Sequence, residues 1–180
     1  MHIIIINGAP MSGKDTFVRI VQKLMGKQCW NYSTVDFVKD IAKQCGWGGL
    51  KDLPSREFLS NLKDLLSNAP WGNVIHEKVK EFIEDKQDEL KHDLTVTNPD
   101  FSLIFIHSRE PQDIKQLVDK FGAKTLVVRR TEAEAQQVSN HADANVLDYV
   151  YDYEIDNNGT LDDLEFQAVA FLTKEFNLRW

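Results

Sequence analysis

The segment from Gly8 to Thr16, GAPMSGKDT, is separated by the single residue Asn7 from a run of four isoleucines at residues 3–6. It matches the phosphate-binding loop pattern G-x-x-x-x-G-K-[ST] at every position except the last, where Asp15 stands in place of serine or threonine. Glycines let successive backbone N–H groups turn toward a phosphate, and the lysine reaches the terminal phosphates. The segment therefore predicts a nucleoside triphosphate site. The residues expected to contact the nucleotide are Gly8, Ala9, Met11, Ser12, Gly13, Lys14, Asp15 and Thr16.

The residues on either side of this loop predict the strand and the helix that a P-loop requires. Residues 2–7 are largely β-branched and uninterrupted, which is typical of a parallel strand buried on both faces. Apolar residues then recur with helical spacing, and the positive N-terminal end of that helix would face the bound phosphate. The expected apolar stripe of this helix is Phe17, Ile20, Val21 and Leu24.

Length and charge limit the classes of partner. The 180 residues suit one domain, and the net charge of −7 gives no basic surface of the kind that binds nucleic acid or an anionic membrane. Cys29 and Cys45 are too few for a disulfide framework, so a cytoplasmic location is expected. The N-terminal apolar run is too short for a membrane span and lacks a basic leader. The oligomeric state stays open, with a homodimer among the alternatives.

Strand and helix signals alternate along the chain, which indicates a parallel α/β sheet. Pro111 and Gly122 are expected to begin and end one helix, and Thr160 with Asp163 resembles a capping box for the last helix. That helix is expected to bury Leu161 with Leu164, Ala168, Phe171 and Leu172, and the tryptophans are expected to pack. The expected strands are residues 2–7, 28–33, 101–108, 126–128 and 153–155, with helices at about 35–45, within 55–91, at 111–121 and after 160.

Two long connections interrupt this alternation. Mainly helical material separates the second expected strand from the third, and a shorter polar stretch separates the fourth from the fifth. Both leave the carboxyl edge of a parallel sheet, where the P-loop also lies. We therefore expect a single domain over residues 1–180 with an acceptor-binding insertion at about 34–97 and a lid at about 130–150. This layout is typical of a small-molecule phosphotransferase, which must exclude water before transfer.

Phosphoryl transfer needs positive charge around the phosphate, and arginines stand at suitable points. Arg109 follows the third strand and could grip an acceptor phosphate, or form a surface ion pair with a nearby carboxylate. Arg56, in the helical insertion, suits a second acceptor clamp or an exposed helix start. Arg129 and Arg130 end the fourth strand, where one of them could act on the transferring phosphate while the other is structural.

Three further polar residues lie near the ends of the second and third strands. Tyr32 and Asp36, near the end of the second strand, could bind a base or sugar, or serve as ordinary strand-end and helix-start residues. His107 ends the third strand and is expected to be a hydrogen-bonded core residue.

The magnesium site is the least conventional feature of the sequence. A P-loop enzyme ordinarily uses the Ser or Thr after the lysine together with an acid at a neighbouring strand end. Here that strand ends in His107, whereas the P-loop carries Asp15. The hypothesis is that Asp15 supplies the carboxylate for Mg²⁺ while Thr16 contacts the α-phosphate. Glu110 is the alternative ligand.

These motifs together resemble a known family. The Gly-Lys-Asp-Thr sequence resembles the deoxynucleoside monophosphate kinases of tailed phages and related bacteria, and animal phosphomevalonate kinases share its Gly-Lys-Asp feature. Residues 32–40 and 46–64 are similar to the segments of such kinases that follow the second strand and bind the acceptor. Residues 155–161, IDNNGTL, resemble the turn before the last helix in these enzymes and in dephospho-coenzyme A kinases.

The resemblance implies a five-stranded sheet of order 2-3-1-4-5, ATP as donor, and a place for Asn157 and Asn158 beside the adenine. It also implies a phosphorylated small-molecule acceptor, most simply a (deoxy)nucleoside monophosphate. Another acceptor, such as phosphomevalonate or dephospho-coenzyme A, and a non-catalytic nucleotide-binding regulator are the alternatives. The stretch 131–150 contains no arginine, although many nucleoside monophosphate kinases carry several there, so Arg129 and Arg130 would supply that charge.

Overall fold

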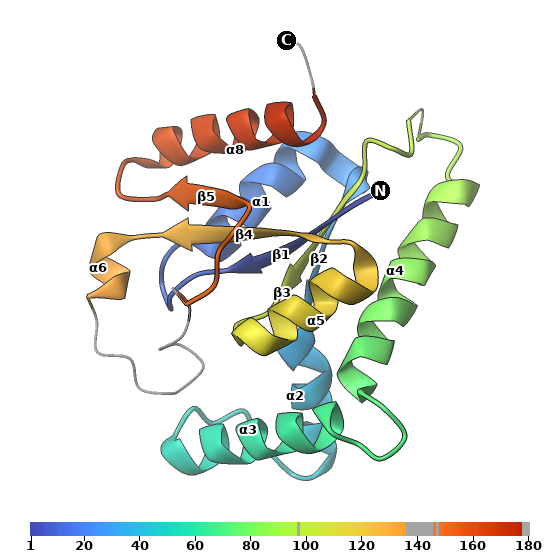
Figure 1. Ribbon diagram of the computed structural model, residues 1–180, viewed down its shortest axis with the longest axis vertical. Coiled ribbons are helices and arrows are strands. Elements are labelled where there is room, and N and C mark those ends of the chain that lie inside the picture. The colour runs from blue at the N-terminus through green and yellow to red at the C-terminus, as the bar shows by residue number, and fades with distance from the viewer. Residues whose placement is uncertain (97, 136–145, 147, 178–180) are drawn as a thin grey trace. The chain divides into compact units, whose positions relative to one another are not determined.

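The structure, a computed structural model, describes residues 1–96, 98–135, 146 and 148–177 (Figure 1). It divides into two compact units, one formed by Met1–Asn31 with Asp93–Trp180 and the other by Tyr32–His92. The second range overlaps the insertion expected at about 34–97, and the organisation as a single domain stays a prediction. The elements are β1 (His2–Asn7), α1 (Lys14–Met25), η1 (Gly26–Gln28), β2 (Cys29–Ser33), α2 (Thr34–Gln44), α3 (Leu53–Ser67), α4 (Val74–His92), β3 (Leu103–His107), α5 (Pro111–Phe121), β4 (Lys124–Arg129), α6 (Thr131–Glu134), β5 (Tyr153–Asp156) and α8 (Leu161–Glu175).

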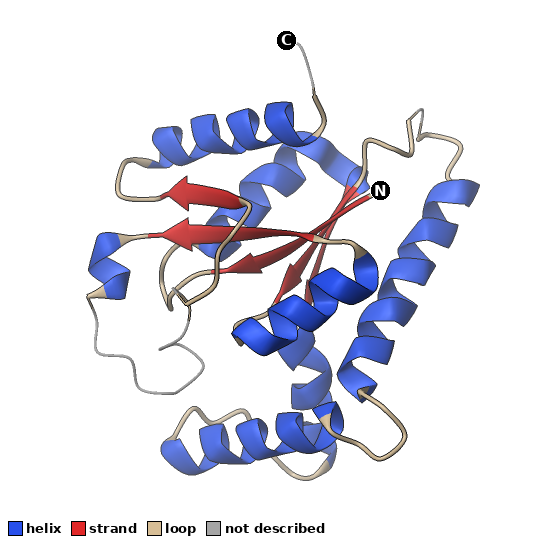
Figure 2. Cartoon of the chain, viewed as in Figure 1, coloured by secondary structure: helices blue, strands red, loops and turns tan. Residues whose placement is uncertain are grey.

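The five strands form one sheet of order β2-β3-β1-β4-β5. β1 pairs in parallel with β3 and β4, and β4 pairs in parallel with β5. Ile4, Ile5 and Ile6 of β1 are fully buried because helices cover both faces of the sheet, α1 and α8 on one face and α5 on the other (Figure 2). The observed order and the parallel pairing confirm the predicted fold class.

The main core lies between the sheet and the pair α1 and α8. Alternate residues of β1 and β4, such as Ile4 and Leu126, meet Phe17 of α1 and Phe171 of α8 there. The two phenylalanine rings contact each other edge to face, with centroids 5.7 Å apart. Because successive side chains of a strand point to opposite faces, Ile5 lies on the other face of the sheet, which α5 covers.

The helix boundaries follow the local signals in the sequence. Pro111 begins α5, and Gly122 ends it in the left-handed conformation with φ 62°. Thr160 and Asp163 form the predicted capping box at the start of α8, with each side chain bonded to the backbone N–H of the other. Both predictions are confirmed.

Three residues predicted to pack are instead exposed. Leu24 is 50% exposed because it lies at the edge of a stripe that is centred on Val21 and continues to Met25. Leu161 is 58% exposed because it is the first residue of α8. Trp71, in the turn before α4, is 83% exposed.

The second unit consists largely of α2, α3 and α4. α4 buries Ile75, Val79 and Ile83, which recur with helical spacing. α3 begins at the N-cap Asp52, whose carboxylate accepts a 2.9 Å hydrogen bond from the Ser55 N–H. None of the residues of α3 is buried.

A buried carboxylate joins four segments of the first unit at the amino edge of the sheet. Only 2% of the Glu175 side chain is exposed. It lies 2.5 Å from Nδ1 of His2 and 2.9 Å from Nζ of Lys124, and it accepts a hydrogen bond from the hydroxyl of Tyr153. One carboxylate thereby connects the starts of β1, β4 and β5 to the end of α8.

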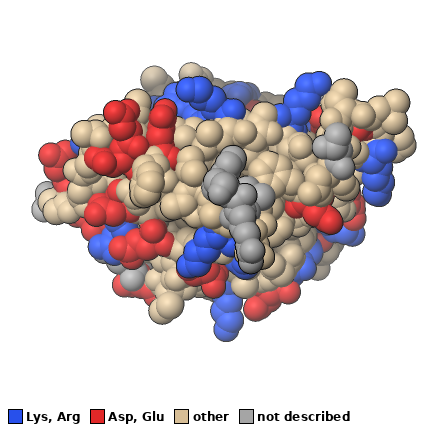
Figure 3. Space-filling view, turned by 90° about the horizontal axis from the view of Figure 1, so that it is seen from above, with Lys and Arg blue, Asp and Glu red and all other residues tan. Residues whose placement is uncertain are grey.

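On the face drawn in Figure 3, lysines and arginines are interspersed with acidic side chains, and the acidic ones gather more densely at one end. Among the described residues, no helix is both long enough and apolar enough to cross a membrane.

Candidate active site

The parallel sheet brings the predicted P-loop and several predicted polar residues of the first unit to one edge. β1 ends at Asn7, β3 at His107, β4 at Arg129 and β5 at Asp156, and the carboxyl ends of parallel strands share one edge. The loops that follow these strands carry the P-loop, Arg109, Arg130 and Asn157. The candidate site of the first unit is built from these loops.

The two glycines of the P-loop are sterically required. A Cβ on Gly8 would lie 2.5 Å from Oγ of Ser12 and 2.7 Å from the carbonyl oxygen of Val128. A Cβ on Gly13, where φ is 93°, would lie 2.2 Å from Nδ2 of Asn157. The loop therefore folds closely against β4 and against the turn after β5.

The interior of the loop has donors suited to an anion. α1 begins at Lys14, and its N-cap is Gly13, which has no side chain to accept a hydrogen bond from the first-turn N–H groups. Oγ of Ser12, a fully buried residue, has no hydrogen-bond partner within the described part of the chain. Uncapped helix amides and a buried hydroxyl are suited to phosphate oxygens, so these residues fit a bound phosphate group.

Met11 adopts a conformation that side chains rarely take. Its φ is 64°, in the left-handed region, and it is 75% exposed. A non-glycine residue in this region costs about 1 kcal/mol or more, and such strain is concentrated at functional sites. The strained residue lies on the rim of the pocket described next.

A pocket of about 470 Å³ lies beside the P-loop. This volume is within the range of ligand sites, which is roughly 300 to 1,000 Å³. Its lining combines three cationic side chains with Leu161 and Leu164 of α8, so it could hold both an anion and an apolar group. The lining residues are Met11, Gly13, Lys14, Asp15, Thr16, Arg19, Arg130, Asn157, Gly159, Thr160, Leu161 and Leu164.

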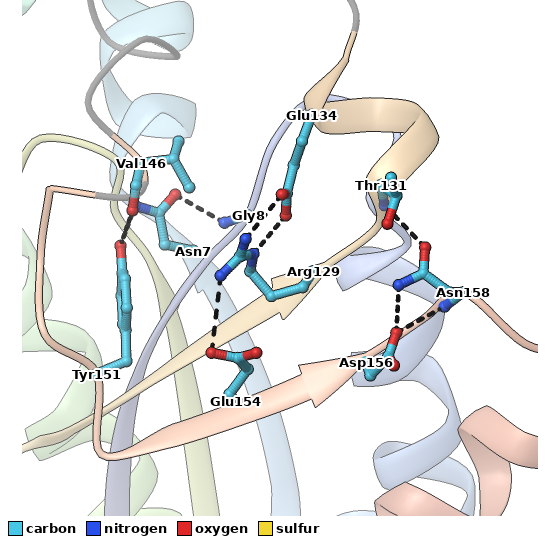
Figure 4. A network of polar contacts seen from close by, with 10 residues as sticks. All are labelled: Asn7, Gly8, Arg129, Thr131, Glu134, Val146, Tyr151, Glu154, Asp156 and Asn158. Carbon is cyan, nitrogen blue, oxygen red and sulfur yellow. Dashed lines mark hydrogen bonds and ion pairs between the residues drawn. The ribbon is translucent and has the colours of Figure 1, made fainter.

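The turn after β5 holds the P-loop in place. Nδ2 of Asn157 donates a 2.7 Å hydrogen bond to the carbonyl of Ser12, and the backbone N–H of Asn157 donates to the carbonyl of Arg129 at 2.8 Å. Oδ1 of Asn158 accepts from the N–H of Thr131 at 2.8 Å, as Figure 4 shows. Asn157 also lines the pocket, whereas Asn158 is outside the lining and joins two protein segments.

The two arginines at the end of β4 have different surroundings. Arg129 forms a two-pronged pair with Glu134, at 2.5 Å and 2.8 Å, and lies 3.7 Å from Glu154 (Figure 4). The hydrogen bond to Glu134 raises the pKa of Arg129 and lowers the pKa of Glu134. Arg130 lines the pocket, and its guanidinium lies 3.0 Å from a carboxylate oxygen of the exposed Glu132.

The expected magnesium ligand is accessible. The side chain of Asp15 is 76% exposed and lies 3.7 Å from Nδ1 of His107, of which 14% is exposed. Among the described residues, no three His, Cys, Asp or Glu side chains are grouped so as to hold a metal. Mg²⁺ is commonly held by one or two carboxylates together with substrate phosphates and water, so Asp15 alone fits that ion. Oγ1 of Thr16 accepts a 3.2 Å hydrogen bond from Arg19.

Arg109 is exposed and follows β3 by two residues, and Glu110 is the N-cap of α5. The backbone carbonyl of Arg109 accepts a 3.0 Å hydrogen bond from Nδ2 of Asn7.

Asn7 and Arg19 were not predicted as site residues. A polar Asn7 at the end of an apolar strand, directly before Gly8, is the signal that could have identified the first of them.

Three predicted acceptor residues, Tyr32, Asp36 and Arg56, belong to the second unit. The ring of Tyr32 packs on Phe82, with centroids 4.7 Å apart. Burial is the main cause that raises the pKa of Tyr32, and nearby acids raise it further. Asp36 pairs with Lys39 at 3.0 Å, and Arg56 is exposed in the first turn of α3. Their roles as acceptor ligands stay predictions.

Of the expected lid at 130–150, residues 136–145 and 147 lie outside the described residues.

No protein-family model matches the chain, and no curated protein sequence matches it. Among solved structures, it is similar to an APS kinase from Mycobacterium tuberculosis, with 12% identity, a TM-score of 0.45 and coverage of 96% of both chains. A gluconokinase from Sinorhizobium meliloti matches with 12% identity and a TM-score of 0.45, over 97% of this chain and 93% of that one. A shikimate kinase from Aquifex aeolicus matches with 11% identity and a TM-score of 0.44, over 98% of both chains.

The class of the site comes from the chain's own residues. A P-loop between the central strand and the first helix of a parallel 2-3-1-4-5 sheet defines a P-loop α/β fold. At 11% to 12% identity, the similarity to these three kinases does not identify an acceptor.

In the predicted ATP site, replacing Gly13 with alanine should weaken the binding of ATP by about tenfold to a hundredfold, because a Cβ must displace Asn157 and break its hydrogen bond to Ser12. The matched control is Gly122→Ala, which puts a Cβ at a second left-handed position with open space around it. Both variants should lose about 1 kcal/mol of stability from backbone strain, but only Gly13→Ala should lose ATP affinity. Titration calorimetry with ATP and Mg²⁺ measures the ATP affinity of both variants. Equal ATP affinity in the two variants would show that the fit between Gly13 and Asn157 is unimportant.

Proposed function

We propose that this protein is an ATP-dependent phosphotransferase that acts on a small phosphorylated acceptor, most simply a (deoxy)nucleoside monophosphate. The observation that carries the proposal is the convergence of the uncapped start of α1, Lys14 and Arg130 on one pocket. Such a pocket supplies the positive charge that a transferring phosphoryl group needs.

The donor would bind with its phosphates in the P-loop. First-turn N–H groups of α1 and Oγ of Ser12 would contact phosphate oxygens, and Lys14 would reach the terminal phosphates. Leu161 and Leu164 also line the pocket and would offer an apolar surface to the base. This placement also gives a reason for the exposure of Leu161 at the start of α8.

Asp15 would hold Mg²⁺, which would neutralise charge on the phosphates. Its carboxylate is accessible, and its neighbour Lys14 lines the same pocket. Thr16, whose hydroxyl is bonded to Arg19, is the proposed α-phosphate contact. Glu110 stays the alternative metal ligand.

Arg130 is the proposed catalytic arginine. It lines the pocket, whereas Arg129 is held by Glu134 and Glu154. An arginine stabilises the charge on the transferring phosphoryl group, and its planar fork can contact two oxygens at once. Arg129, which was also predicted to bind ATP, is therefore proposed to position the backbone that carries Arg130.

Arg109 of the first unit is the proposed clamp on the acceptor phosphate. Tyr32, Asp36 and Arg56 of the second unit are each proposed as acceptor ligands in their own right. Placing both phosphates in line lets positioning and charge carry out most of the catalysis. The nucleotide acceptor is favoured by the sequence resemblance. Another phosphorylated acceptor is the second candidate, because that resemblance extends to phosphomevalonate and dephospho-coenzyme A kinases.

The experiment that tests the proposal is ADP release from ATP and Mg²⁺ with a panel of candidate acceptors. The panel contains nucleoside and deoxynucleoside monophosphates, phosphomevalonate and dephospho-coenzyme A. One class of acceptor should stimulate ADP release, and Arg109→Ala should raise the KM for that acceptor while leaving the KM for ATP nearly unchanged. If no compound stimulates ADP release, the phosphotransferase proposal is wrong.

Asp15→Asn should reduce activity by about a hundredfold and raise the Mg²⁺ concentration needed for half-maximal rate, because the amide loses the charge that attracts the ion. Glu110→Gln is the matched control and should leave both quantities nearly unchanged. Binding of Mn²⁺ in the presence of ATP, followed by electron paramagnetic resonance, gives a readout independent of turnover. Weaker Mn²⁺ binding in Glu110→Gln but not in Asp15→Asn would assign the metal to Glu110.

A further inference from the structure

Asn7 is a buried amide at the junction of β1 and the P-loop, with only 1% of the residue exposed. Its Oδ1 accepts a 2.8 Å hydrogen bond from the N–H of Gly8, the first residue of the loop. Its Nδ2 donates to the carbonyl of Arg109 at 3.0 Å and to the hydroxyl of Tyr151 at 2.8 Å. All the hydrogen-bonding capacity of the Nδ2 group is thus used within the protein.

Tyr151 extends this network to the segment before β5. Its hydroxyl accepts the bond from Asn7 and donates to the carbonyl of Val146 at 2.8 Å, as Figure 4 shows. Burial raises the pKa of Tyr151 to about 12, so the hydroxyl keeps its proton and continues to donate at neutral pH. The contacts join residues 144 and 102 positions apart in the chain.

The network connects the proposed donor site to the proposed acceptor site. Gly8 belongs to the loop that would hold the ATP phosphates, and Arg109 is the proposed acceptor clamp. A shift of the Gly8 backbone moves the Asn7 side chain, because Oδ1 and Nδ2 belong to one planar amide. That side chain holds the backbone of Arg109 on one side and Tyr151 on the other.

We propose that Asn7 and Tyr151 are positioning residues that couple occupation of the P-loop to the placement of the Arg109 backbone. The inference rests on the proposed binding of ATP at the P-loop and of an acceptor at Arg109. ATP binding would tighten the network through Gly8, and the acceptor clamp would be ordered before the acceptor arrives. Neither residue touches the reacting phosphates in this proposal.

The test is amide hydrogen exchange by NMR, with and without the non-hydrolysable analogue AMP-PNP and Mg²⁺, in the full chain. Tyr151→Phe removes one hydroxyl and keeps the ring that packs on Tyr149, with centroids 5.1 Å apart. Tyr149→Phe is the matched control, because the Tyr149 hydroxyl forms no hydrogen bond within the described residues. AMP-PNP should slow exchange both in the P-loop and at Arg109 and Glu110 in the wild type and in Tyr149→Phe.

In Tyr151→Phe, the P-loop protection should persist while the protection at Arg109 and Glu110 falls by about fivefold to tenfold, the factor that corresponds to one net hydrogen bond. Undiminished protection at Arg109 in Tyr151→Phe would overturn the coupling, as would P-loop protection without any effect at Arg109 in the wild type. In both of those cases nucleotide binding itself would stand. If AMP-PNP protects neither region, the donor site and the coupling are both wrong.

Discussion

Replacing Arg130 with alanine should lower kcat about a thousandfold in the proposed reaction, while stability and ATP affinity should change little. The expected size is that of an arginine that stabilises the transferring phosphoryl group. Stability should change by less than about 1 kcal/mol, because the pair of Arg130 with Glu132 is exposed. Steady-state kinetics with the acceptor found in the panel, together with thermal unfolding, measures both effects.

Arg129→Ala is the matched control, and it should behave in the opposite way. The two-pronged pair with Glu134 is lost, so the unfolding midpoint should fall, whereas kcat should fall by no more than about tenfold. Glu134→Gln weakens the same pair from the other side and should give a similar decrease in the midpoint. A thousandfold loss of kcat in Arg129→Ala with nearly full activity in Arg130→Ala would reverse the assignment.

Replacing Glu175 with alanine should lower the free energy of unfolding by about 3 kcal/mol, because one buried carboxylate satisfies three partners from three strands. The site is at the amino edge of the sheet, far in the fold from the P-loop edge, so ATP affinity of the folded variant should be unchanged. Urea unfolding at neutral pH measures the loss. Glu165→Gln, at an exposed position of the same helix, is the control and should change stability by less than about 0.5 kcal/mol.

The same carboxylate should make stability depend on pH in the acid range. Burial by itself would raise the pKa of Glu175, but hydrogen bonds from Tyr153, His2 and Lys124 hold the pKa below its ordinary value. A lowered folded-state pKa stabilises the protein above the unfolded-state pKa, and this stabilisation is lost as the pH falls through the folded-state value. The free energy of unfolding should therefore fall less steeply below about pH 4.5 in Glu175→Gln than in the wild type. Parallel curves would show that Glu175 does not carry this dependence.

Much of the first unit could be predicted because its signals are local. The isoleucines of β1 are buried on both faces, and Pro111 with Gly122 and Thr160 with Asp163 mark helix ends by backbone geometry that a sequence shows directly. The strand order, by contrast, came from the family resemblance, since local pattern alone does not specify which strands pair.

The errors arose where a prediction depended on the end of an element. Leu161 follows the helical spacing of the core residues of α8, but spacing does not reveal that the first turn lies beside the P-loop pocket. Trp71 is apolar, yet its turn provides no covering element for it in the described structure.

Parts of the candidate site depend on contacts that are distant in sequence. Arg129 and Arg130 are adjacent at a strand end, and the sequence does not show that Glu134 of α6 and Glu154 of β5 hold the first of them. The bond between Asn7 and Tyr151 likewise has no local signature. The Asp15 hypothesis, which came from the sequence, stays a prediction, and the structure adds the nearby His107.

The most direct test of the central claim follows the terminal phosphoryl group of ATP labelled with ³²P at the γ-position, in the presence of Mg²⁺ and the stimulating acceptor. A phosphotransferase should move the label to the acceptor, with one labelled product for each ADP formed, and Lys14→Met should abolish this transfer. Release of the label only as inorganic phosphate, or unchanged transfer in Lys14→Met, would contradict the proposal that the P-loop directs the phosphoryl group to a second substrate.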